Sequence, residues 1–320
     1  MKAIVRKVKT LFRLLVGNSR SISAVRARVL INIRKLILWC HRKPFLYKTG
    51  FGFRFGCFPD SYTSRTLYIE RNFEKVEICL VRSWLEENDA VLDIGANIGS
   101  YSIALAERIG KKGKVIAVEP SKKTACYIES LAKMMKMEQV HVEKCCVMNC
   151  VGYCDFLISH SGRADISQSL AAASRSEVDF IKERVPAATI DDIVRRYRIA
   201  GNVSLIKMDI EGAEPLALEK CSLINENKAL PLVILEVFKR RLREMNFFPE
   251  DVYRYFPIER YDLFFINKSY PNTSCEFLLD RIYRMEGVKA SDLPWHLNLI
   301  AVPRVGIFSD RRRKIQKFLD

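Results

Sequence analysis

Two patterns of apolar and polar positions alternate along most of the chain: short uninterrupted apolar runs and longer amphipathic stretches. The apolar runs predict strands over residues 90–94, 114–118, 140–147, 153–158, 203–208, 232–237, 262–266 and 296–302. The amphipathic stretches predict helices over residues 100–109, 122–137, 191–197, 214–225 and 249–255. Repeated strand–helix units of this kind are typical of an α/β fold with a doubly wound, mostly parallel sheet covered on both faces.

The residues before this repeat follow other patterns. The periodicity predicts a helix over residues 74–87, and the aromatic stretch at 45–58 is typical of irregular strands or hairpins. Two apolar stripes at helical spacing, Ile4 to Leu15 and Ile22 to Leu36, predict two amphipathic helices in the first 43 residues. We therefore divide the chain into a basic helical N-terminal extension (1–44), a pre-core segment (45–89), a main domain (90–303) and a basic C-terminal tail (304–320).

The net charge of +16 is concentrated at the two ends of the chain. Residues 1–59 hold 14 Lys and Arg and no acidic residue, and residues 304–320 hold six basic and two acidic residues. The residues between them hold 33 basic and 35 acidic side chains, which is the balance of an ordinary globular domain. If the positive charge attracts a negatively charged partner, the two ends of the chain rather than the main domain would bind it.

Four interpretations of the acid-free N-terminal stretch stay open, and we favour the first. Basic and apolar side chains in alternation can dock residues 1–44 on an anionic membrane surface. The same features fit an organellar transit peptide, a nucleic-acid contact or a solvated cap on the core. No run of about 18 apolar residues is present, so we expect no membrane-spanning helix. We expect a cytoplasmic protein that is peripheral to a membrane under the first interpretation and organellar under the second.

Composition excludes two further classes of protein. With 49% hydrophobic residues the chain can bury a large core, which excludes global disorder. The ten Cys are irregularly spaced in a chain too long to need covalent staples, so we interpret them as reduced intracellular thiols. Cys146, Cys150 and Cys154 are evenly spaced, but Cys145 and Cys146 would face opposite sides of a strand and no second Cys/His pair follows. We predict no metal site.

The strongest chemical signal is the sequence VLDIGANIG at residues 91–99. An apolar strand ends in Asp93, and a turn of small residues from Gly95 to Gly99 opens the next helix. Such a turn lets a ligand approach backbone amides at the sheet edge where open α/β folds bind ligands. The next strand ends in Glu119, whose carboxylate can accept two hydrogen bonds from neighbouring ribose hydroxyls. The two strand ends together predict a cofactor that contains a nucleoside.

Two classes of cofactor that contain a nucleoside would fit these two strand ends. Dinucleotide sites prefer a second glycine where this chain has Asn97, and Asp93 would repel a pyrophosphate. S-adenosylmethionine carries a cationic amine, a sulfonium and a ribose but no phosphate, and the Asp93 carboxylate suits its amine. We therefore predict S-adenosylmethionine as the cofactor and methyl transfer as the reaction class.

These residues resemble the FkbM family of S-adenosylmethionine-dependent methyltransferases, a class I group with a Rossmann-like fold. The resemblance extends over about residues 73–302. It is carried by FEKVE at 73–77, VLDIGANIGSYSIALA at 91–106, VIAVEPS at 115–121, ATIDD at 188–192, LIKMDIEGAE at 205–214 and the apolar run at 232–237. Of these, LIKMDIEGAE is the most distinctive. The resemblance implies a seven-stranded sheet and an O-methyltransferase that acts on a hydroxyl of a sugar, a glycolipid or a secondary metabolite.

The resemblance also implies which residues hold the donor. It places against the donor Asp93, Gly95, Ala96, Asn97, Gly99 and Tyr101, with Glu119 at the ribose and Pro120 and Ser121 beside the adenine. Asn149 follows the third strand. A contact with the edge of the adenine and a purely structural role in a turn are equally good interpretations of this residue.

A hydroxyl acceptor needs a proton acceptor as well as in-line approach to the methyl group. Asp209 ends the fourth strand beside the donor's methyl group, so it is our first candidate for the base or for positioning the nucleophile. Glu211 and Glu236 are the alternatives, and Glu211 together with Glu214 fits a helix-capping role equally well. Lys207 lies two positions before Asp209 on the same strand and is expected to pair with a carboxylate.

One position departs from the family pattern. Many relatives have a His two residues after the equivalent of Glu236, whereas this chain has Phe238, so no role of that His is carried over. His296 stands at the start of a predicted strand, and we interpret it as structural.

Two other classes of function remain. The basic ends would suit methylation of nucleic acid or protein, but the DIEG sequence at 209–212 does not resemble the Asn/Asp-Pro-Pro-aromatic motif of many base-amine methyltransferases. A non-catalytic binding module would not need Asp93, Gly95, Gly99 and Glu119 together. We expect the acceptor to be a small molecule or a glycan rather than nucleic acid.

Overall fold

The computed structural model describes residues 20–50, 52–70, 74–159, 180–225, 229–267, 282–288 and 292–319. The first of the two predicted N-terminal helices lies outside these residues. The second is present as α2 (Arg20–Cys40). None of the described helices combines the length and the hydropathy needed to cross a bilayer.

The protein is built on one large mixed sheet. Its strands are, in spatial order, β12 (Ile282–Arg284), β11 (Tyr261–Asn267), β13 (His296–Pro303), β10 (Leu232–Phe238), β9 (Val203–Met208), β3 (Ala90–Ile94), β4 (Lys114–Val118) and β5 (Val140–Glu143). Neighbours from β10 to β5 are parallel, and β13 is antiparallel to both β10 and β11. The predicted α/β fold is confirmed. Within the described residues the sheet has eight strands rather than seven, because the three residues of β12 pair with the edge of β11.

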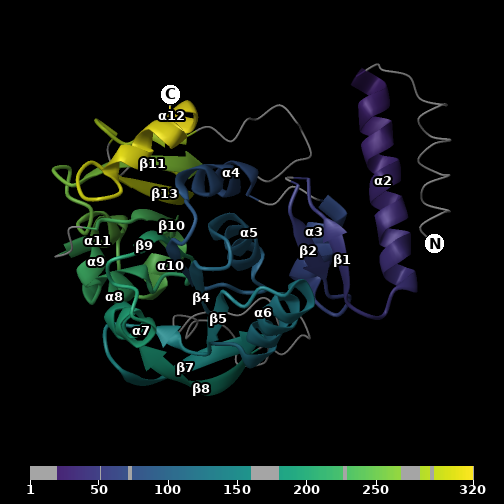
Figure 1. The fold of residues 1–320 in the computed structure, drawn as a ribbon, viewed down its shortest axis with the longest axis horizontal. Helices are drawn as coiled ribbons and strands as arrows, with labels where there is room; N and C mark the ends of the chain where they lie inside the picture. The colour runs from purple at the N-terminus through teal and green to yellow at the C-terminus, as the bar shows by residue number, and fades with distance from the viewer. Residues whose placement is uncertain are drawn as a thin grey trace.

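Helices cover both faces of this sheet (Figure 1). One hydrophobic cluster joins it to α4 (Lys75–Trp84), α5 (Ser100–Ile109), α6 (Lys122–Met135) and α12 (Arg312–Leu319). The other joins it to α7 (Ile190–Tyr197), α8 (Glu214–Glu219), α9 (Ser222–Asn225), α10 (Lys239–Glu244) and α11 (Pro249–Tyr253). Val91 belongs to the first cluster and Leu92 to the second, because successive strand residues face opposite sides. The apolar runs are uninterrupted for this reason.

A second, smaller sheet lies beside β5. It consists of β6 (Cys146–Val147), β8 (Phe180–Ala188) and β7 (Gly152–Ser159). The single strand predicted over 140–147 is thus divided between two sheets, and β8 was not predicted. All nine cysteines in the described part of the chain are free thiols.

The pre-core segment forms the predicted hairpin and one helix that was not predicted. β1 (Phe45–Lys48) pairs antiparallel with β2 (Arg54–Cys57), and α3 (Tyr62–Glu70) follows. Edge-to-face contacts join Tyr68 to Phe45 and to Tyr47, with ring centroids 5.1 and 5.0 Å apart. Figure 1 shows α2 beside this segment, on the side away from the large sheet.

The basic C-terminal segment folds back on the main domain. It forms η3 (Ser309–Arg311) and α12, with Ile315 fully buried. Arg311 pairs with Asp89 at 2.5 Å, and Lys314 pairs with Glu86. Part of the C-terminal positive charge is therefore neutralised by ion pairs within the fold.

Candidate active site

The turn after β3 packs directly on the chain that leaves β9. The amides of Gly95 and Ala96 both donate to the carbonyl of Val118, at 2.9 and 3.0 Å. Gly95 has φ +77°, and a Cβ atom there would lie 1.8 Å from the carbonyl oxygen of Asp209. Only glycine fits at this approach, which brings the ends of β3, β4 and β9 to one place.

The carboxylate at the end of β4 is held by the turn after β3 and by the start of α6. Glu119 Oε2 accepts the amide of Asn97 at 2.8 Å, and Oε1 accepts the amide of Ser121 at 2.9 Å and the Thr124 hydroxyl at 2.8 Å. Burial raises the pKa of Glu119, although these donors favour its ionised form. Oε2 has a lone pair left for a further donor, whereas both lone pairs of Oε1 are used. The carboxylate is thus fixed in place and can still accept a ribose hydroxyl at Oε2.

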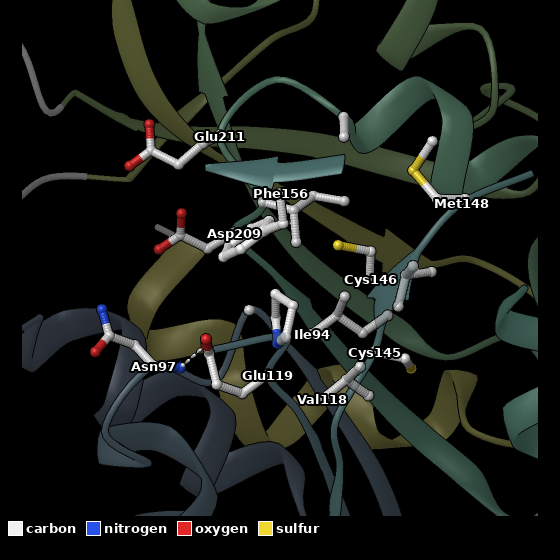
Figure 2. Close-up of a pocket in the computed structure, with 15 residues that line it drawn as sticks. Ile94, Asn97, Val118, Glu119, Cys145, Cys146, Met148, Phe156, Asp209 and Glu211 are labelled. Carbon is white, nitrogen blue, oxygen red and sulfur yellow. Dashed lines mark hydrogen bonds between the residues drawn. The ribbon is translucent and has the colours of Figure 1, made fainter. Parts of the chain in front are cut away.

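A pocket opens at these strand ends (Figure 2). It is lined by Ile94, Gly95, Asn97, Val118, Glu119, Pro120, Cys145, Cys146, Val147, Met148, Phe156, Asp209, Ile210, Glu211 and Ala213. Figure 2 shows the sulfur-containing side chains of Cys145, Cys146 and Met148 on the side away from Asp209 and Glu211. The pocket therefore has an apolar wall suited to a flat base, a carboxylate for a ribose, and an acidic end.

Asp93 lies behind the pocket and is fully buried. Its Oδ2 accepts the hydroxyl of Ser102 at 2.5 Å, and its Oδ1 is 3.9 Å from Lys207 Nζ. Oδ1 has no hydrogen-bond donor among the described residues, and burial raises the pKa of this carboxyl. A buried acceptor without a donor is costly unless a ligand supplies one. Asp93 therefore fits a ligand that brings an N–H donor such as an amine.

Lys207 is the cation of the site. Its Nζ lies 3.5 Å from Asp209 Oδ2 and 5.2 Å from the ring centre of Tyr101. Burial alone would lower the pKa of this ammonium, but the carboxylates of Asp209 and Asp93 outweigh burial, so its pKa is raised. Lys207 thus stays charged and balances the negative charge at the ends of β3 and β9, as expected from the sequence.

Three carboxylates gather at the acidic end of the site. Oxygens of Asp209, Glu211 and Glu236 lie within 4.8 Å of one another, a spacing at which three carboxylates can share a cation. Each also has a basic neighbour: Lys207 at 3.5 Å from Asp209, Arg241 at 3.0 Å from Glu211 and His296 at 2.7 Å from Glu236. These neighbours offset part of the negative charge of the cluster, and the absence of a metal here stays a prediction from the sequence.

Glu214 begins α8 and is buried below this cluster. Its two oxygens accept the amides of Ile210 and Gly212 at 3.1 and 3.0 Å, so it holds the loop between β9 and α8 in shape. Burial raises the pKa of Glu214 to about 8. The helix-capping alternative weighed from the sequence therefore describes Glu214, whereas Glu211 lines the pocket.

This raised pKa predicts a pH-dependent stability. Between about pH 4.5 and about 8 the unfolded chain has lost this proton while the folded chain keeps it, so the free energy of unfolding falls as pH rises. One such group contributes at most about 1.4 kcal/mol per pH unit. The glutamine in Glu214→Gln cannot ionise, so the free energy of unfolding of this variant should fall less steeply between these pH values. Any pH-independent loss of stability caused by the amide does not change this slope. Urea unfolding at several pH values measures the slope.

Glu87→Gln, an exposed position, is the matched control and should keep the wild-type slope. An unchanged slope in Glu214→Gln would show that Glu214 ionises at an ordinary pH.

The structure brings many of the predicted site residues together and moves others away. Six of them line the pocket: Gly95, Asn97, Glu119, Pro120, Asp209 and Glu211. Ala96, Gly99 and Ser121 shape the two turns around it, and Asp93 and Glu236 lie outside the lining. Tyr101 is buried and donates to Glu74 at 2.5 Å, while half-buried Asn149 donates to Glu219 at 3.0 Å. Asn149 does not line the pocket.

Sequence reasoning missed the apolar wall and two neighbours of the acidic cluster. The wall comes from β6 and β7, and only its position after the third predicted strand could have indicated it. No pattern in the sequence indicated that Arg241 would contact Glu211. Phe238 lies directly opposite His296 in the β10–β13 register, so an imidazole approaches Glu236 from the neighbouring strand.

Comparison with known proteins agrees with this geometry. A family model described as "Methyltransferase FkbM domain" matches residues 93–263, more than half of the chain. A search of curated proteins found no match.

Among solved structures, an S-adenosylmethionine-dependent O-methyltransferase from Thermotoga maritima is 13% identical, with 80% of this chain and 77% of that chain covered and a TM-score of 0.39. A methyltransferase FkbM from Methylobacillus flagellatus KT is 15% identical, with coverages of 74% and 52% and a TM-score of 0.40. A precorrin-6y C5,15-methyltransferase from Geobacter metallireducens is 11% identical, with coverages of 71% and 87% and a TM-score of 0.36.

Proposed function

The chain belongs to the FkbM family of methyltransferases, and on this premise we propose that it transfers a methyl group to a hydroxyl of a sugar, a glycolipid or a secondary metabolite. Its cofactor is S-adenosylmethionine, which supplies a methyl group on a sulfonium when it is bound. The observation that carries the proposal is that one pocket is lined both by Glu119, held for a ribose, and by the carboxylates of Asp209 and Glu211.

The residues present fit this cofactor. Glu119 would accept a ribose hydroxyl, and Cys146, Met148 and Phe156 would pack against the adenine. Asp93 has the buried oxygen without a donor that an amine would satisfy. The contacts for ribose and adenine would suit a dinucleotide equally, but the carboxylates of Asp93, Asp209 and Glu211 would repel its pyrophosphate, and this supports S-adenosylmethionine.

Hydroxyl chemistry is supported by the acidic end of the site. A neutral hydroxyl loses its proton as it takes the methyl group, so a carboxylate within hydrogen-bond reach is required. Asp209 is 37% exposed, lines the pocket and is held by Lys207, so it can accept the hydroxyl's hydrogen bond and take its proton. Methylation of nucleic acid is not favoured, because part of the basic C-terminal charge is paired internally.

The test of this proposal is a comparison of glycans and metabolites from cells with and without the gene. A hydroxylated compound that lacks the mass of one CH₂ in the deletion strain identifies the acceptor class. Purified protein should then restore that mass to the compound with S-adenosylmethionine present. A methyl group missing only from nucleic acid or protein would contradict the proposal.

We also propose that residues 1–44 contact an anionic membrane and so bring the site to a lipid-linked acceptor. The outward side of α2 supports this: Leu36 is 60% and Trp39 is 82% exposed, next to exposed Lys35. Ile37 and Leu38 pack against the core on the other side. An apolar side chain flanked by cations is the composition that binds in a headgroup layer.

The full chain should sediment with anionic vesicles and much less with neutral ones. Each basic residue at the surface contributes about 1 kcal/mol, and salt should weaken binding without abolishing it because apolar burial remains. The variant Leu36→Ser with Trp39→Ala should bind more weakly, while Val151→Ser, an exposed apolar position just before β7, serves as control. If the full chain stays in the supernatant with both vesicles, the membrane proposal fails.

A further inference from the structure

Glu236 and His296 form a close pair at the acidic end of the site. β13 runs antiparallel to β10, so its first residue lies at the edge where β9 and β10 end. His296 Nε2 is 2.7 Å from Glu236 Oε1, and the two side chains are 22% and 17% exposed. The pair is therefore largely shielded from solvent but lies next to Asp209 and Glu211.

The imidazole is held in one orientation from a second side. Its ring stacks on Phe238 with centroids 4.8 Å apart and an interplanar angle of 25°, and Trp295 packs beside both rings. Stacking fixes the ring plane, and the contact with Glu236 fixes the position of Nε2. A side chain fixed in this way can set the proton affinity of its partner.

Many charged groups face Glu236. Asp209, Glu211, Glu214 and Glu74 add negative charge, and Lys207 and His296 lie on the neighbouring strands. Burial and then the carboxylates, Asp209 foremost, raise the pKa of Glu236 well above its usual range. Among the basic partners of the three clustered carboxylates, His296 is the one whose side-chain type can both give and take a proton, because Lys and Arg stay charged.

We propose that Glu236 and His296 together take up the proton released by the acceptor hydroxyl, with His296 as the positioning residue that holds Glu236 ready to receive it. This rests on the proposed function. The acceptor's O–H bond breaks and its O–C bond forms as the methyl–sulfur bond of the donor breaks. Asp209 takes the hydroxyl's proton, which then passes through one bridging water to Oε2 of Glu236, while the hydrogen on Nε2 of His296 stays in the contact with Oε1. One proton leaves the hydroxyl and one arrives at the pair, which later releases it to water.

The decisive measurement is the titration of the Glu236 carboxyl, followed by ¹³C NMR in the full chain with S-adenosylhomocysteine bound, from about pH 4 to about pH 10. His296→Phe keeps the stacked ring but removes the nitrogen donor, so Glu236 should titrate at least about one pH unit higher than in the wild type. His296→Gln keeps an N–H donor without ionising, so the titration should stay close to that of the wild type. Melting temperatures verify that both variants are folded.

An unshifted titration in His296→Phe would overturn the proposal, and so would equal shifts in both variants. With the acceptor in hand, the rising limb of the pH–rate profile should move upward in His296→Phe and return in His296→Gln. A purely structural role would lower the rate equally at every pH. The titration needs no acceptor, so failure to find methyl transfer would contradict the proposed function without deciding the role of the pair.

Discussion

Asp209→Asn should lower turnover by about 10²–10⁴-fold while leaving the affinity for S-adenosylmethionine almost unchanged. The substitution keeps the size of the side chain but removes its ability to take a proton. Asp209 lines the pocket, and its carboxylate is fixed by Lys207 at 3.5 Å. Because a hydroxyl must lose its proton as the methyl group arrives, the loss should appear in kcat rather than in donor binding.

Turnover is measured as the formation of S-adenosylhomocysteine, and donor affinity by calorimetry. Asp155→Asn is the matched control, because this exposed carboxylate pairs with Lys182 on the small sheet. It should keep the wild-type rate. A comparable loss of donor binding in Asp209→Asn would make Asp209 a cofactor-binding residue, and unchanged turnover would return the role to Glu236 or Glu211.

Glu119→Ala should weaken the binding of S-adenosylmethionine by roughly 1.5–3 kcal/mol, about 10- to 150-fold in Kd. The variant removes the carboxylate, and with it Oε2, the oxygen that has a lone pair left for a ribose hydroxyl. It also removes the acceptor of the Asn97 amide, so the turn after β3 becomes less fixed. Both effects reduce affinity for the donor, and calorimetry with S-adenosylhomocysteine measures their sum.

Glu143→Ala provides the control for this variant. Glu143 ends the neighbouring strand β5 and binds Arg196 and Tyr197, but it does not line the pocket. Donor affinity should therefore be unchanged. Equal affinities in Glu119→Ala and the wild type, or tighter binding of NAD than of S-adenosylmethionine, would refute the assignment of this pocket.

The strands of the main sheet and the helices between them could be predicted because each depends on a local sequence pattern. β3, β4 and β9 have the predicted bounds, since a strand buried on both faces is an uninterrupted apolar run. α5 also has its predicted bounds, beginning after a glycine turn and ending before Gly110. β8 was missed, and residues 140–147 were taken as one strand, because nothing local indicates that the chain changes sheets there.

The closeness of the residues predicted to bind the donor followed from the sequence for a related reason. Asp93, Gly95 and Glu119 stand at the ends of adjacent parallel strands, and parallel strands bring their carboxyl ends to one edge. Position along each strand was then enough to place them together. Asn149 shows where this reasoning ends, because a residue in a loop has no such register and its partner, Glu219, lies far away in sequence.

By itself the sequence determined the α/β class and the family, and it placed Asp93, Gly95 and Glu119 at one edge of the sheet, since each depends on residues close together in the chain or on a fixed strand order. Only the tertiary structure decided what surrounds the three clustered carboxylates. Arg241 reaches Glu211, and His296 reaches Glu236 from a strand 60 residues further along the chain. Such contacts depend on antiparallel register and helix packing, which bring distant segments together without leaving a pattern in either segment.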